Sequence, residues 1–68
     1  MEHANELYNE VCFLTYKEVE RITGMSRSTI YRQVRQGKFP KPRVLAERKI
    51  GFVTVELKNW IQDRRVVR

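Results

Sequence analysis

The sequence places two helix starts close together, with a helix-ending glycine between them. Thr15-Tyr16-Lys17-Glu18 fits a capping box, in which the threonine and glutamate side chains each accept a backbone N–H of the other residue. Gly24 predicts the end of this first helix, because glycine adopts the left-handed backbone conformation without steric cost. Ser26 is a favourable N-cap for a second helix. Two short helices separated only by Gly24 and Met25 are typical of a helix-turn-helix.

The second predicted helix has one apolar edge and one polar face. Ile30 and Val34 stand four residues apart and define the edge that packs on the core. Gly37 predicts the end of the helix. At about 100° per residue, the opposite face presents hydroxyl, phenol and guanidinium groups: Ser28, Tyr31, Arg32 and Arg35. Such groups suit contacts with phosphates and base edges, so the sequence predicts a DNA-binding helix.

An extended segment and a β-hairpin are predicted to follow. Pro40 and Pro42 exclude a helix from residues 38–42, where Phe39 is the apolar anchor. Residues 43–53 fit a hairpin with a polar tip at 46–49, and its apolar strand residues are Val44, Leu45, Ile50, Phe52 and Val53. Gly51 indicates a weak strand, a bulge or a close approach of another segment. The tip lacks a strong turn signal, so the register stays open.

A third helix is expected from Thr54 to about Arg64, with Thr54 as its N-cap. The complete order of elements predicts a mainly α fold with a small β-hairpin, a winged helix-turn-helix. This domain is expected over residues 13–64, after a flexible or weakly helical segment at 1–12 and before a basic tail at 65–68. The predicted core consists of Phe13, Val19, Ile22, Met25, Ile30, Val34, Phe39, Phe52, Leu57, Trp60 and Ile61.

Positive charge is concentrated in the middle of the chain. The formal net charge is +6. Residues 1–25 carry five acids against two bases, whereas residues 26–49 carry eight bases against one acid. Such a concentration is typical of proteins that bind a polyanion. The alternative is a solvated basic surface that binds nothing.

The residues also exclude several classes of protein. Cys12 is the only cysteine and His3 the only histidine, so neither an internal disulfide nor a structural zinc site is expected. No nucleophile–base pair, paired carboxylates or phosphate-binding glycine loop is evident, so we expect no enzyme, cofactor or small-molecule substrate. No apolar run approaches the roughly 20 residues that cross a membrane. The sequence predicts a soluble, cytoplasmic, nucleoid-associated protein.

Residues 13–63 resemble the AlpA-like phage regulators and the related excisionases. The resemblance rests on three pieces: FLTYKEVERITGMSRSTIYRQVRQGKFPKPR, Ile50-Gly51-Phe52 and VELKNWIQ. Phe52 stands where family members usually carry tryptophan, which is a mild departure. The resemblance implies a MerR-like winged-helix fold whose second helix enters the major groove of DNA. It also implies that the hairpin wing contacts the flanking backbone.

The residues and the resemblance together give a candidate DNA-binding surface. The second helix is expected to contact bases and phosphates through Ser26, Arg27, Ser28, Thr29, Tyr31, Arg32 and Arg35. The linker and wing are expected to contact phosphates through Lys38, Lys41, Arg43, Arg48 and Lys49. Two alternatives stay open: Ser26 acts only as a cap, and each arginine is only part of a solvated helix face.

The predicted function is sequence-specific binding of double-stranded DNA by a regulator of prophage or genomic-island genes, an excisionase, or both. The resemblance implies that an integrase, or further copies of the chain on DNA, are its protein partners. The alternative is a small protein-interaction module that acts on an integrase or a regulatory protein. RNA is less favoured as a ligand, because the aromatic residues mostly have core assignments.

Overall fold

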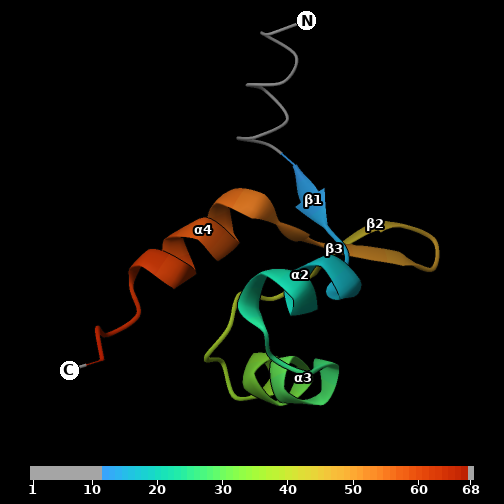
Figure 1. The fold of residues 1–68 in the computed structure, drawn as a ribbon. Helices are drawn as coiled ribbons and strands as arrows, with labels where there is room; N and C mark the ends of the chain where they lie inside the picture. The colour runs from blue at the N-terminus through green and yellow to red at the C-terminus, as the bar shows by residue number, and fades with distance from the viewer. Residues whose placement is uncertain (1–11, 68) are drawn as a thin grey trace, which may run out of the picture.

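Three helices and a three-stranded antiparallel sheet form the part of the chain that this computed structural model describes, residues 12–67 (Figure 1). In chain order the elements are β1 (Phe13–Leu14), α2 (Tyr16–Thr23), α3 (Arg27–Arg35), β2 (Arg43–Ala46), β3 (Lys49–Val53) and α4 (Thr54–Gln62). This architecture is compatible with a winged helix-turn-helix. The MerR-like relationship stays a prediction, as does the division into segments 1–12, 13–64 and 65–68. Most of the first of these segments lies outside the described residues.

The helix pair is confirmed, together with the signals that predicted it. The Thr15 hydroxyl accepts the Glu18 backbone N–H at 3.1 Å, and the Glu18 carboxylate accepts the Thr15 N–H at 2.8 Å. Gly24 has the left-handed φ of 74°, and its N–H donates to the Glu20 carbonyl at 2.8 Å. The Ser26 hydroxyl accepts the Thr29 N–H at 3.3 Å. Local capping chemistry therefore sets both the end of α2 and the start of α3.

Removal of the first cap is expected to weaken the fold measurably. The Thr15→Ala substitution removes one half of the capping box and should lower the free energy of unfolding by about 1 kcal/mol. Thr15→Ser keeps the hydroxyl and is the matched control. Urea unfolding followed by circular dichroism compares the two variants. An alanine variant as stable as the serine variant would contradict the contribution assigned to the cap.

The hairpin is confirmed, but it belongs to a larger sheet than the sequence predicted. The strand order is β1-β3-β2, and β1 pairs with β3 through Phe13 opposite Val53 and Leu14 opposite Phe52. Between β2 and β3 the register shifts at Leu45, which is the site of the irregularity. The tip is shorter than predicted, since Ala46 and Lys49 are paired strand residues. The fold therefore contains a three-stranded sheet rather than an isolated hairpin.

Gly51 is a point of close approach. A Cβ atom at this position would lie 2.9 Å from Leu45 Cδ1 and 3.2 Å from Phe13 Cβ. The bulge lies on the neighbouring strand, at Leu45. Among the three interpretations of Gly51 that the sequence left open, close approach is therefore the one that the structure bears out.

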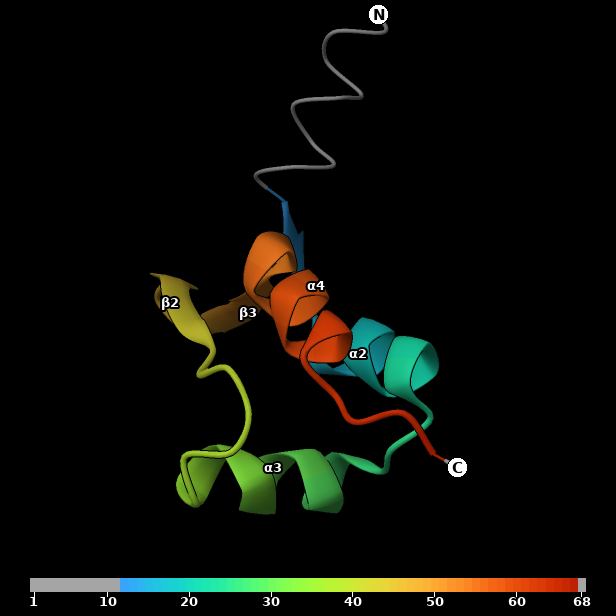
Figure 2. The ribbon, with the colours of Figure 1, turned by 90° about the vertical axis from the view of Figure 1, so that its left-hand side faces the viewer.

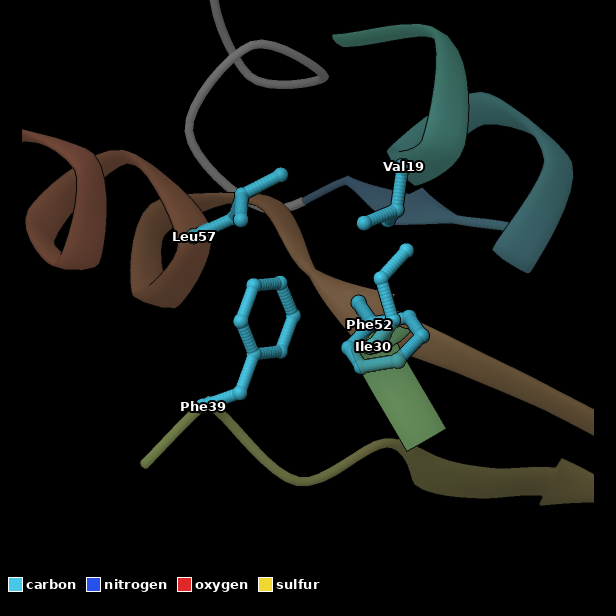
Figure 3. Close-up of a cluster of buried hydrophobic side chains, with 5 residues drawn as sticks. All are labelled: Val19, Ile30, Phe39, Phe52 and Leu57. Atoms are coloured by element: carbon cyan, nitrogen blue, oxygen red, sulfur yellow. The ribbon is translucent and has the colours of Figure 1, made fainter. Parts of the chain in front are cut away.

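Five side chains form the buried core and are drawn in Figure 3: Val19, Ile30, Phe39, Phe52 and Leu57. The Phe52 ring makes edge contacts with Tyr16 at 4.9 Å and with Phe39 at 5.7 Å between ring centroids. Around this cluster pack the partly buried residues Leu14, Tyr16, Met25, Val34 and Trp60. The core thus joins both helices of the pair to the sheet and to α4.

Three predicted core residues are exposed instead. Phe13 is 46% exposed, Ile22 52% and Ile61 43%. Phe13 pairs with Val53, one residue beyond the buried Phe52, and alternation along a strand turns it to the opposite face of the sheet. Ile22 and Ile61 line an apolar groove between α2 and α4.

The predicted N-cap of the third helix was wrong. The cap is Val53, and Thr54 is the first helical residue. The Thr54 backbone N–H donates to the Cys12 carbonyl at 2.8 Å. The Thr54 hydroxyl is buried and has no hydrogen-bond partner in residues 12–67. The helix ends at Gln62, two residues before the predicted end.

Candidate nucleic-acid interface

Helix α3 packs through one edge and leaves its opposite side open. Ile30 is fully buried and Val34 is half-buried, as the sequence predicted. The opposite side carries the exposed residues Ser28, Tyr31, Arg32 and Arg35. Figure 2 shows α3 along the lower edge of the molecule, where no other element covers its outer side. The polar face predicted from the helical period is therefore a surface of the folded chain.

Hydroxyl groups cluster at the start of α3. The Ser26 hydroxyl lies 2.9 Å from the Thr29 hydroxyl and 3.3 Å from the Ser28 hydroxyl. The same Ser26 oxygen caps the helix by accepting the Thr29 N–H. Ser26 thus has a structural role as the cap of α3, and Ser28 is exposed on the same turn.

Arg27 is held by two partners within the helix pair. Its Nε donates to a Glu20 carboxylate oxygen at 2.7 Å, and its guanidinium carbon lies 5.2 Å from the centre of the Tyr16 ring. Burial raises the pKa of the Tyr16 phenol, with a further rise from Tyr31 and an opposing effect from Arg27, so the phenol is neutral at pH 7. Sequence reasoning missed Glu20 as the partner of Arg27.

Arg32 and Arg35, unlike Arg27, have no side-chain partner within residues 12–67. Together with Tyr31 and Gln36 they line a shallow hollow on the outer side of α3. Within residues 12–67, neither arginine takes part in an ion pair or a side-chain hydrogen bond. Their guanidinium groups keep all of their donors available for an external acceptor. The structure therefore separates the arginines of α3 into one that is held and two that are available.

The wing shows the same division. Arg43 at the start of β2 is ion-paired with Glu56 of α4. Arg48 at the tip adopts a left-handed backbone with φ 65°, and it is exposed, as are Lys49 and Glu47. Figure 1 shows the hairpin projecting away from α4, with its tip free of the helices. Arg48 and Lys49 are thus accessible cations of the wing, and Arg43 links the wing to α4.

The linker between α3 and the wing is anchored from α4. Phe39 is buried against Trp60, with 4.6 Å between ring centroids. The Trp60 indole N–H donates to the Lys38 backbone carbonyl at 2.8 Å. The side chains of Lys38 and Lys41 are exposed. The core assignment of Trp60 is therefore correct, and its anchoring contact fixes the path of the basic linker.

In residues 12–67 no group of three His, Cys, Asp or Glu side chains is placed to hold a metal ion. None of the helices in the range has the length and apolar character needed to cross a membrane.

The fold and this surface define a small helix-turn-helix protein with an exposed basic second helix and a basic hairpin. Residues 12–65 match the family described as the prophage CP4-57 regulatory protein (AlpA). The chain belongs to this AlpA family of phage regulatory proteins, which confirms the resemblance.

A relative from a phage supports the same assignment. The chain is 36% identical over 52 residues to the uncharacterized protein ORF88 of Enterobacteria phage P4. The match covers 76% of this chain and 59% of the phage protein, so the chain spans less than two thirds of that relative. No solved structure matches the chain significantly.

Proposed function

We propose that this chain binds double-stranded DNA sequence-specifically and regulates genes of a prophage or genomic island. The observation that carries the proposal is the pair of available arginines, Arg32 and Arg35, on the uncovered side of a helix whose other edge is buried. Arginine pairs bidentately with guanine O6 and N7 in the major groove. The AlpA membership supports a regulatory role.

The dimensions of α3 suit the major groove. An α-helix with its side chains is about 10–12 Å in diameter, and the major groove is about 12 Å wide, so the nine-residue α3 can lie in the groove. With the buried Ile30 edge on the core, the arginine side of the helix is the side that enters the groove. Recognition helices of this kind contact base edges while their neighbouring elements contact the backbone.

The linker and wing supply the phosphate contacts in this proposal. The accessible cations outside α3 are Lys38, Lys41, Arg48 and Lys49. They contribute affinity without sequence information. Arg27 and Arg43 contribute less to each of these tasks, because a carboxylate already accepts from each guanidinium group. The proposed DNA contacts are thus made by the basic residues that have no carboxylate partner, and the ion-paired arginines contribute less.

Salt dependence tests whether these cations bind phosphates. Four phosphate contacts predict a log–log slope of affinity against salt near −3.6, so doubling the salt should weaken binding about 12-fold. Fluorescence anisotropy with a labelled duplex from the region around its own gene measures the slope. Binding that does not respond to salt would overturn the proposed mode of binding.

A matched pair of variants sharpens this test. Lys49→Gln removes a wing cation and should reduce the slope by about 0.9. Lys58→Gln removes the same charge from α4, on the apolar groove between α2 and α4, and should leave the slope unchanged. Equal salt slopes for the two variants would contradict the proposed contact between the wing and DNA phosphates.

Transcriptional regulation and excision are both compatible with the proposed surface. An excisionase binds the attachment-site DNA of its element and contacts an integrase or further copies of itself there. Anisotropy titrations with promoter duplexes and with attachment-site duplexes compare the two roles. Tighter binding to promoter duplexes would favour transcriptional regulation, and tighter binding to attachment-site duplexes would favour excision. Binding to chromosomal DNA in either role implies association with the nucleoid.

A further inference from the structure

An apolar hollow lies where β1 meets the base of the hairpin. Its volume is about 320 Å³. An engineered apolar cavity of about 150 Å³ holds a benzene molecule, so the hollow has room for several apolar side chains. The residues that line it include Cys12, Phe13, Leu45, Lys49, Ile50 and Gly51. The half-exposed Phe13 and Ile50 are therefore rims of one concave surface rather than isolated apolar residues.

The shape of the hollow depends on Gly51. This glycine is buried, and a side chain there would meet Leu45 and Phe13. The three core helices pack on the side of the sheet that carries Phe52, so they do not cover Phe13, which faces the other way. One rim is cationic, because Lys49 lines the hollow and Arg48 precedes it at the wing tip. The hollow thus suits an apolar segment that also carries negative charge.

Residues 1–11 of the same chain have this chemistry. Ala4, Leu7, Tyr8 and Val11 follow the i, i+3, i+4, i+7 spacing of an amphipathic helix. The segment carries three glutamates and no lysine or arginine. At about 100° per residue, Glu10 lies at the edge of this apolar stripe, so its carboxylate is next to the surface on which the stripe packs.

The connection to the fold also favours this segment. Residue 11 joins Cys12, which itself lines the hollow. As a helix, eleven residues extend about 16 Å, so Leu7 and Val11 lie within reach without any long connection. A separate partner would lose translational and rotational freedom on binding, whereas a segment of the same chain does not bear this cost.

We propose that residues 1–11 dock on this hollow of their own chain, with Leu7 and Val11 against Phe13 and Leu45 and with Glu10 beside Lys49. The docked segment lowers the affinity of the wing for phosphates, because the Glu10 carboxylate neutralises the charge of Lys49. This second consequence rests on the proposed DNA binding, whereas the docking itself does not.

NMR on the full chain tests the docking without DNA. Contacts by nuclear Overhauser effect are expected from the Leu7 and Val11 methyl groups to the Leu45 methyl groups and the Phe13 ring. A mixture of isotope-labelled and unlabelled chains identifies contacts between copies. Absence of the contacts overturns the proposal, and so do contacts that arise only between copies. Because the NMR experiment contains no DNA, it tests the docking even if the proposed DNA binding is wrong.

Duplex binding tests the effect on the wing. The double substitution Leu7→Ser with Val11→Ser should tighten binding to a non-specific duplex at least threefold at 50 mM salt, with the difference shrinking as salt screens the charges. Val66→Ser with Val67→Ser is the matched control, because these valines are 91% and 92% exposed. Unchanged affinity of the first variant overturns the competition with phosphates.

Discussion

Replacing both Arg32 and Arg35 with alanine is expected to abolish discrimination between a specific and a non-specific duplex. A bidentate arginine–guanine pair contributes about 1–3 kcal/mol of discrimination, so two pairs together contribute roughly 2–6 kcal/mol, a factor of about 30 or more. The side chains are exposed and have no partner in residues 12–67, so the substitution leaves no buried group unsatisfied. The fold should therefore remain intact while specificity is lost.

Competition binding at fixed salt measures this loss. A labelled specific duplex is displaced by unlabelled specific or scrambled duplex, and the ratio of the two competitor affinities is compared between variants. Lys17→Ala with Arg21→Ala is the matched control, since it removes the same formal charge from exposed positions on α2. This control should weaken both duplexes alike and preserve the ratio. If the Arg32 and Arg35 variant also preserved the ratio, these arginines would be phosphate contacts.

The parts of the fold that the sequence predicted are those set by local chemistry. Capping boxes, glycine ends and proline restrictions act within a few residues, and Thr15, Gly24 and Ser26 behave in the structure as their local signals indicate. The buried edge of α3 follows from the helical period alone, so Ile30 and the exposed arginines were placed on the correct sides.

The parts that could not be predicted depend on pairing between distant residues. Strand β1 has two residues, too few to show an alternation, and it exists because Phe13 and Leu14 pair with β3. That register also turns Phe13 out of the core. The third helix likewise begins one residue earlier than predicted, directly after Val53, which pairs with Phe13 of β1.

The same limit applies to the candidate interface. The sequence placed Arg27 and Arg43 in the candidate surface together with the other basic residues of the second helix and the wing. Arg27 meets Glu20 only because the turn brings α2 and α3 together, and Arg43 meets Glu56 only because the hairpin returns to α4. Tertiary structure thus reduces the predicted set to a smaller group of available cations. The DNA contacts themselves stay a prediction.

Phe52→Ala is expected to unfold the domain under conditions in which the unmodified chain is folded. The Phe52 ring is fully buried and makes edge contacts with Tyr16 and Phe39. Truncation of a buried phenylalanine costs about 3–5 kcal/mol. A single core in a domain of this size rarely supplies more than about 3–5 kcal/mol of net stability. The loss therefore equals most or all of the stability available.

The matched control is Phe13→Ala, which deletes the same ring from a half-exposed position on the other face of the sheet. Because about half of that ring is already in water, its removal should cost about 1 kcal/mol. Circular dichroism during heating and urea titration compares the variants, and loss of the cooperative transition is the expected result for Phe52→Ala. Similar stabilities of the two variants would contradict the central position of Phe52. In that case the domain would depend on the contacts of Phe39, Trp60 and α4 instead.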